Sequence, residues 1–188
     1  LHYLNWTNCS SSRISCSRSS TVEGVSTPDY FPAAPEGGEL IHTRFYEART
    51  YKMSDDLFLL RGVVCDEKPA GLYMAGDPDP LWVHHMVVDL EITFPMFVIQ
   101  KVSVTFHERP HTHCTDIEPD YQKLVGLSIA RGFNKQVKEL FGGPRGCTHI
   151  GALLAAMAPV AIQSGWSMRM GNTLDNEEFD SATTAEQR

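Results

Sequence analysis

The clearest pattern of hydrophobic and polar positions in this 188-residue chain runs from Trp82 to Phe94. Its even-numbered residues are apolar apart from one histidine, whereas most of its odd-numbered residues are polar. Side chains of a β-strand alternate between its two faces, so this period of two predicts a strand with one buried face. The pattern places His84 on the buried face and His85 on the opposite, outward face.

Three further segments predict strands, either from alternation or from a short apolar run. They are Leu40–Tyr51, Leu57–Cys65 and Phe97–Phe106. Pro95 separates the last of them from the strand that contains His84, so these two should pair as a hairpin with His84 opposite Phe106. Residues 66–80 are rich in proline and glycine and predict a long loop, a kind of segment that often carries function.

The second half of the chain predicts three helices. Their ranges are Glu118–Ser128, Phe133–Phe141 and His149 to about Gln163. Pro119 suits the first turn of a helix, the glycine pair at Gly142 suits a helix end, and Thr148 can cap the third helix. Strands followed by helices predict an α+β fold, with an antiparallel sheet followed by three helices packed on one face.

The two ends of the chain differ in composition from this central part, so we expect a single α+β domain over residues 39–168. Residues 1–38 are rich in serine and have no periodic pattern, which predicts a flexible N-terminal arm. Residues 169–188 carry five acidic residues among small polar ones, which predicts a disordered acidic tail.

The composition is that of a globular protein, 42% hydrophobic and 21% charged, with a formal net charge of −7. An acidic chain lacks the basic surface that attracts nucleic acid or anionic membranes, so we expect a small-molecule substrate and neither of those partners.

The longest apolar run, Ile150–Ile162, is shorter than the roughly 18 residues of a membrane span. Five irregularly spaced cysteines and no leader pattern favour a cytoplasmic protein with free thiols. The sequence leaves open whether the protein forms a homo-oligomer.

Two cysteines share one predicted context, because Cys114 and Cys147 each lie just before a helix start. A thiol there is favoured as the thiolate, which is a nucleophile or a metal ligand. The predicted hairpin brings His84 near the segment that delivers Cys114. We therefore predict that His84, Cys114 and Cys147 bind one divalent ion, zinc or iron, with a position left open for water or substrate. The alternative is that all three are buried structural residues.

Other residues near this predicted centre are candidates for supporting roles. His149, two residues after Cys147, is a candidate ligand or proton shuttle, and the two residues together are candidate catalytic groups. Trp82 and Met86 share the predicted face of His84 and should line a substrate pocket. A histidine cluster follows the hairpin, either as a separate metal site or as a solvated loop; its members are His107, His111 and His113.

Several motifs lie between about residues 40 and 163. They are Arg44-Phe45-Tyr46, Leu60-Arg61-Gly62, Val83-His84 with Met86, Cys114 before Pro119 and Tyr121, Leu124-Val125-Gly126-Leu127, Gly142-Gly143 and Gly146-Cys147-Thr148-His149-Ile150. In these motifs the chain resembles the bacterial domain-of-unknown-function family numbered 2889. Members of that family usually carry Asp directly after the hairpin histidine, where this chain has His85. The family label implies no particular reaction.

A more distant similarity is to U-type iron–sulfur scaffold proteins, which also follow an antiparallel hairpin with helices that start at cysteines. This resemblance implies a U-type scaffold-like fold, with Cys114 and Cys147 as metal ligands and His84 near a further ligand position. The first cysteine of those scaffolds has no counterpart, because Trp82 and Val83 occupy its place. The difference favours a single metal ion over cluster assembly.

Three classes of function fit these observations. The first is a metal-dependent enzyme, of lyase or hydrolase type, that acts on an aromatic or apolar catabolite. The second is a metal or iron–sulfur carrier or scaffold protein. The third is a cofactor-free enzyme in which Cys114 or Cys147 is the nucleophile and His149 its base. The chain has neither a glycine-rich phosphate loop nor a dinucleotide-binding fingerprint, which argues against nucleotide chemistry.

Overall fold

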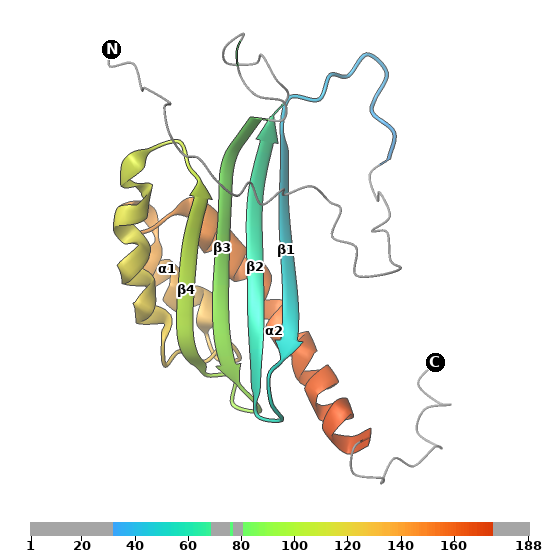
Figure 1. The fold of residues 1–188 in the computed structure, drawn as a ribbon, viewed down its shortest axis with the longest axis vertical. Helices are drawn as coiled ribbons and strands as arrows, with labels where there is room; N and C mark the ends of the chain where they lie inside the picture. The colour runs from blue at the N-terminus through green and yellow to red at the C-terminus, as the bar shows by residue number, and fades with distance from the viewer. Residues whose placement is uncertain (1–31, 69–75, 77–80, 175–188) are drawn as a thin grey trace. The chain divides into compact units, whose positions relative to one another are not determined.

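The computed structural model describes residues 32–68, 76 and 81–174 (Figure 1). The chain divides into two compact units, Leu1–Glu39 and Leu40–Arg188. In the first unit, the described residues 32–39 are exposed and contain a turn that the Gly38 N–H closes on the Pro35 carbonyl at 2.9 Å. Most of the predicted arm, and the tail from residue 175, lie outside the described residues.

The second unit contains a four-stranded antiparallel sheet in the order β1-β2-β3-β4. The strands are β1 (Thr43–Lys52), β2 (Leu57–Lys68), β3 (Leu81–Thr93) and β4 (Ile99–Glu108). Each strand follows a predicted one within a few residues at its ends. The sheet is a simple meander, so every strand pairs with its neighbour in sequence.

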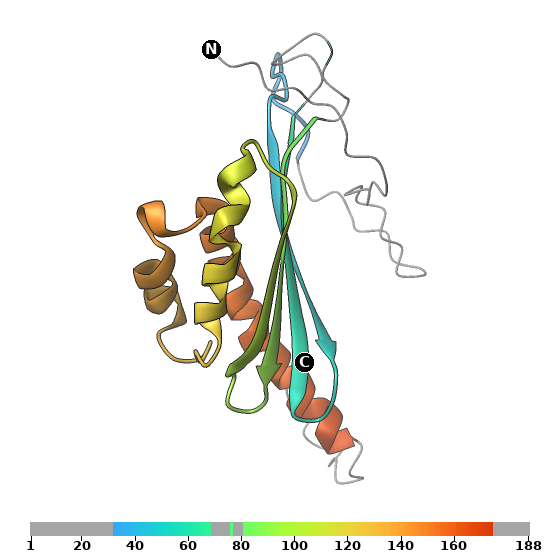
Figure 2. The same ribbon diagram turned by 60° about the vertical axis from the view of Figure 1, so that its left-hand side comes forward.

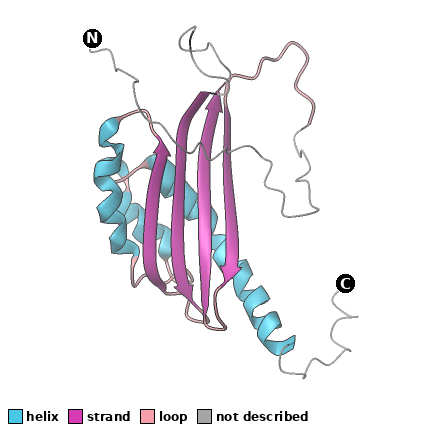
Figure 3. Ribbon diagram, in the orientation of Figure 1, coloured by secondary structure: helices cyan, strands magenta, loops and turns pink. Residues whose placement is uncertain are grey.

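The helical elements follow the strands in sequence. They are η1 (Thr112–Leu124), α1 (Phe133–Phe141), η2 (Gly143–Arg145) and α2 (Thr148–Leu174). Figure 2 shows them all on one side of the sheet, and Figure 3 separates the two layers by colour. The α+β prediction, with an antiparallel sheet covered on one face by helices, is therefore confirmed.

The hydrophobic core lies between the sheet and these helices. Even-numbered residues of β2 and β3 supply the sheet side, and they are Phe58, Leu60, Val64, Met86, Val88, Leu90 and Ile92. From α2, the buried side chains Leu153, Leu154 and Met157 join the same cluster. Gly62 continues the series without a side chain because a Cβ there would lie 2.3 Å from the Met157 sulfur. The period of two therefore identifies the buried face correctly.

Two of the helix predictions need correction at their ends. The predicted start at Glu118 is wrong, since η1 is a 3-10 helix that begins at Thr112 and contains Pro119 in its interior. Proline has a helix-compatible φ and lacks only one N–H, so it did not mark the first turn here. Cys114 therefore lies inside the first turn of η1. The last helix extends to Leu174, well beyond the predicted Gln163.

The hairpin register also differs from the prediction. Phe106 lies opposite Met86, whereas His84 pairs with Asp66 on the other neighbouring strand. The register of β3 against β4 shifts twice, and that of β2 against β3 shifts between Asp66 and Glu67. Such bulges add a residue to one strand and move every later pair. His84 therefore lies opposite Asp66 of β2, and the pairing of β3 with β4 ends at His85 and Glu108.

Helix α2 is long and apolar enough to cross a membrane, by length and composition alone. Its segment Thr148–Met170 has a mean hydropathy of 1.3, enough for a membrane span by those criteria. Only part of this segment is buried, 39% of the tested window. Core helices of soluble proteins pass the same test, and α2 contributes buried side chains to the core throughout this segment.

Candidate metal centre

A polar cluster lies on the helix-covered face, at the end of the sheet where β2 finishes and β3 begins. Asp66 and His84 are paired across these two strands, and His149 lies in the first turn of α2. One possible ligand atom from each residue lies within 4.8 Å of the other two. The alternation that buries Val64 on β2 brings Asp66 to the same face, where its side chain is only 1% exposed.

Arg44 on β1 pairs with the Asp66 carboxylate through two hydrogen bonds. Its Nε and a terminal guanidinium nitrogen donate to Oδ1 and Oδ2, each at 2.5 Å. His42 Nε2 lies 3.3 Å from Oδ1. Burial alone raises the pKa of Asp66, but the hydrogen bonds from Arg44 and His84 outweigh it and lower the pKa to about 2. Asp66 is therefore a carboxylate at neutral pH.

His84 is oriented by the same carboxylate. Its Nδ1 lies 2.8 Å from Asp66 Oδ2, and its side chain is 14% exposed. Burial lowers the pKa of His84, although the hydrogen bond to Asp66 opposes that change. The neutral ring donates its Nδ1 proton to Asp66. Nδ1 is also the ring nitrogen beside the carboxylate, so an ion shared with Asp66 would bind at Nδ1 in place of this proton.

His149 packs against His84 from the helix side, with 3.9 Å between the ring centroids. Its Nε2 lies 3.8 Å from Asp66 Oδ2. Burial, followed by the charges of His84 and Arg44, lowers the pKa of His149 to about 4. The cluster thus combines one carboxylate with two neutral imidazoles at neutral pH.

Cys147 lies beside this cluster at the start of α2. Its sulfur is 3.5 Å from His149 Nδ1, on the opposite side of the ring from Asp66. Its backbone is fixed twice, because the N–H donates to the Tyr121 hydroxyl at 3.0 Å and the carbonyl accepts from Gly151 N–H at 2.9 Å. Burial raises the pKa of Tyr121 to about 12, so its hydroxyl stays protonated. The thiol therefore has a defined position next to His149.

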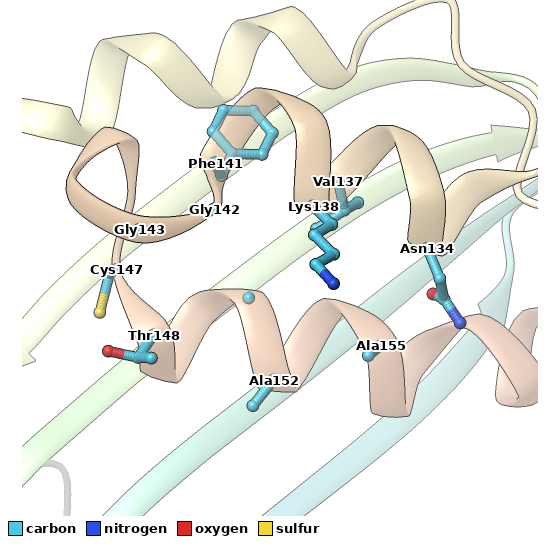
Figure 4. Close-up of a pocket in the computed structure, with 11 residues that line it drawn as sticks. Asn134, Val137, Lys138, Phe141, Gly142, Gly143, Cys147, Thr148, Ala152 and Ala155 are labelled. Carbon is cyan, nitrogen blue, oxygen red and sulfur yellow. The ribbon is translucent and has the colours of Figure 1, made fainter.

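A groove of about 320 Å³ lies between α1 and the first turns of α2 (Figure 4). Its lining residues are Asn134, Val137, Lys138, Phe141, Gly142, Gly143, Cys147, Thr148, Gly151, Ala152 and Ala155. Cys147 is the residue shared by this groove and the surroundings of His149. A small molecule in the groove would therefore contact Cys147, the neighbour of His149.

The structure brings together only some of the residues selected from the sequence. His84 and His149 are in the cluster, and Cys147 contacts it through His149. Cys114 is half-buried in η1 and packs on the hydrophobic core. Within residues 32–68, 76 and 81–174, the ligand set that converges contains neither cysteine. Shared coordination by His84, Cys114 and Cys147 stays a prediction.

The two residues expected to line a pocket lie elsewhere. Met86 is buried in the hydrophobic core, and the Trp82 ring packs edge-on against His85 with 5.6 Å between centroids. Neither residue lines the groove between α1 and α2. The outward histidine His85 is itself buried and lies 4.7 Å from the His107 ring. Burial is also the first cause that lowers the pKa of His85, to about 4.

Asp66 and Arg44 were not selected from the sequence. Asp66 was assigned to the predicted loop 66–80, whereas β2 continues to Lys68. A signal was present, because Asp66 continues the even-numbered series of β2 that ends in Val64. Arg44 has no such signal, since its partner is fixed by the pairing of β1 with β2.

Residues 42–163 match the family described as "Protein of unknown function (DUF2889)". The chain belongs to the DUF2889 family. No curated protein matches the chain, and no solved structure matches it. The region matched to DUF2889 contains the whole cluster, from His42 to His149, and the groove beside it.

Proposed function

We propose that this DUF2889 protein is a metal-dependent enzyme that acts on a small apolar molecule, with a divalent ion bound by Asp66, His84 and His149. One observation carries the proposal: three ligand atoms from β2, β3 and α2 converge within 4.8 Å of one another. The residues come from separate parts of the chain. The convergence therefore does not follow from neighbouring positions in the sequence.

The residue types fit zinc or ferrous iron. Two histidines and one carboxylate on three protein elements are a common ligand set for both metals and leave positions open for water or substrate. Metal binding requires deprotonated ligands, and the cluster is in that state at neutral pH. Arg44 orients the carboxylate through two hydrogen bonds, as second-layer partners of metal ligands usually do.

A bound ion would supply Lewis acidity for a hydrolase or lyase reaction. The chain's own groups provide the rest of the centre. Arg44 fixes the Asp66 carboxylate, and Asp66 fixes the ring of His84. Cys147, whose sulfur is 3.5 Å from His149, is placed to exchange a proton at the edge of the groove.

The test is the metal content of the purified protein, measured by plasma mass spectrometry for zinc and iron. We expect about one ion per chain in the wild type and at least a tenfold loss in His149→Gln, since losing one of three ligands removes most of the affinity. His113→Gln is the matched control because His113 is an exposed histidine of the same structure. Equal metal content in wild type and His149→Gln, or a wild type that binds neither metal, would reject the proposal.

A second candidate is the cofactor-free cysteine enzyme. The contact between Cys147 and His149, with Asp66 on the far side of the ring, follows the order of nucleophile, base and orienting group. In this case Cys147 of chelator-treated protein should react with iodoacetamide at neutral pH much faster than Cys114 does. His149→Gln should remove the difference. Fast alkylation together with no bound metal would favour this candidate over the metal enzyme.

A further inference from the structure

We propose that the groove between α1 and α2 binds a small organic anion that has an apolar or aromatic body and one carboxylate. As the substrate site of the centre described above, the groove rests on the proposed function. As a binding site it needs no metal ion. The two claims can therefore fail separately.

The charge of the lining points to an anion. Lys138 is the cationic residue of the lining, which contains no acidic residue. Within the described residues, its ammonium has no ion-pair partner, whereas Lys135 on the same helix lies 3.8 Å from Glu139. Figure 4 shows Lys138 and Asn134 extending from successive turns of α1 toward α2, so an ammonium and an amide both face the groove. A carboxylate would pair with the first and accept a hydrogen bond from the second.

The remaining lining limits the size and polarity of the ligand. Val137 and Phe141 provide apolar contacts from α1, and the α2 side consists mainly of Gly151, Ala152 and Ala155. The absence of long side chains on that side keeps the groove open. Its volume of about 320 Å³ is at the lower end of the range for small-molecule sites. One ring with a short chain fits this volume.

The groove extends from Lys138 and Asn134, which would bind the carboxylate, to Cys147. Thr148 and Ala155 are separated by about 10 Å along the helix axis, given a rise of about 1.5 Å per residue. Asn134 lies by Ala155, and Cys147 lies by Thr148 at the opposite end (Figure 4). A ligand whose carboxylate meets Lys138 and Asn134 would therefore direct its other end toward Cys147. Cys147 in turn contacts His149 of the candidate centre.

The test is isothermal titration of chelator-treated protein with 3-phenylpropionate and with the uncharged alcohol 3-phenylpropan-1-ol. We expect the wild type to bind the acid at least tenfold more tightly than the alcohol. Lys138→Met should remove this preference, whereas Lys135→Met, on the same helix but outside the lining, should retain it. Equal binding of acid and alcohol, an unchanged preference in Lys138→Met, or no binding of the acid would overturn the proposal.

A pair of alanine variants locates the ligand within the fold. Ala152→Leu should fill the groove and abolish binding of 3-phenylpropionate, while Ala156→Leu, an exposed position outside the lining, should bind as the wild type does. Zinc content in both variants should match the wild type, because neither residue is a metal ligand. Retained binding in Ala152→Leu would place the anion elsewhere and overturn the proposal. A wild type that binds 3-phenylpropionate but neither zinc nor iron would reject the proposed enzyme function alone.

Discussion

The helix-covered face of the sheet has two ends with opposite chemistry. At one end, Phe58 and Ile92 pair across β2 and β3 and are completely buried in the hydrophobic core. At the other end, Asp66 and His84 occupy equivalent paired positions on the same two strands. Helix α2 runs along both ends, with His149 in its first turn near the polar part and Gly165 against the Phe97 ring, which packs on Phe58 of the apolar part. The backbone pattern is therefore continuous, and only the side chains change.

This difference shows which end the fold needs for stability. Apolar burial is worth about 1.5–3 kcal/mol for each large side chain, whereas a buried carboxylate costs free energy unless it is paired. Asp66 meets that requirement with Arg44 and His84. A leucine at position 66 would continue the core without such partners. The polar end is thus a place where chemistry, and not packing, accounts for the residues.

The largest expected effect comes from the apolar end. Leu153→Ala should lower the free energy of unfolding by about 2–5 kcal/mol, because it removes a fully buried side chain and leaves a cavity. Urea denaturation followed by circular dichroism measures this change. Metal bound per folded molecule should stay at the wild-type value. A loss below about 1 kcal/mol would show that α2 is not packed on the sheet as described.

A smaller effect is expected where α2 approaches the sheet most closely. Gly62→Ala should destabilise the protein by about 1–3 kcal/mol, since the new Cβ would lie 2.3 Å from the Met157 sulfur and 2.8 Å from its Cγ. Adding Met157→Ala to Gly62→Ala removes the clashing atoms. The cost of the double variant should therefore fall below the sum of the two single costs. Strictly additive costs in the double-mutant cycle would contradict the close approach.

Two arginine–aspartate pairs of the sheet provide the next comparison. Arg44→Met should cost about 1–3 kcal/mol, since it removes a donor pair from the almost fully buried Asp66. Arg61 also makes two hydrogen bonds to a strand aspartate, Asp89, but that pair is exposed. Arg61→Met should therefore cost less than about 1 kcal/mol. If the two variants lose equal free energy of unfolding in thermal or urea denaturation, the Arg44–Asp66 pair is not more desolvated than the exposed Arg61–Asp89 pair.

Most of the fold was predictable from local patterns. The period of two identified the buried face of β3, and the Phe133–Phe141 helix has the predicted ends. The register was not predictable, because bulges at His85 and Asp66 depend on pairing with neighbouring strands. The pairing predicted for His84, opposite Phe106, is therefore taken by Met86, and His84 lies opposite Asp66 of β2.

The candidate centre was predictable in part for the same reason. His84 was selected because it interrupts an apolar face, and His149 because it follows Cys147 at a helix start. Those signals are local in sequence. Arg44 and Asp66 belong to the centre through β1–β2 pairing, which joins residues that are distant in the chain. Asp66 continues the even-numbered series of β2, but Arg44 carries no comparable pattern, because only the pairing of β1 with β2 fixes its partner.

The most direct test of the metal centre is the zinc K-edge absorption spectrum of the zinc-loaded protein at neutral pH. The Asp66, His84 and His149 site predicts a first shell of nitrogen and oxygen only, at about 2.0–2.2 Å, with imidazole scattering beyond it. The same spectrum should lose an imidazole contribution in His149→Gln at any residual zinc. A sulfur shell at about 2.3 Å would contradict the site described here and would support coordination by Cys114 and Cys147.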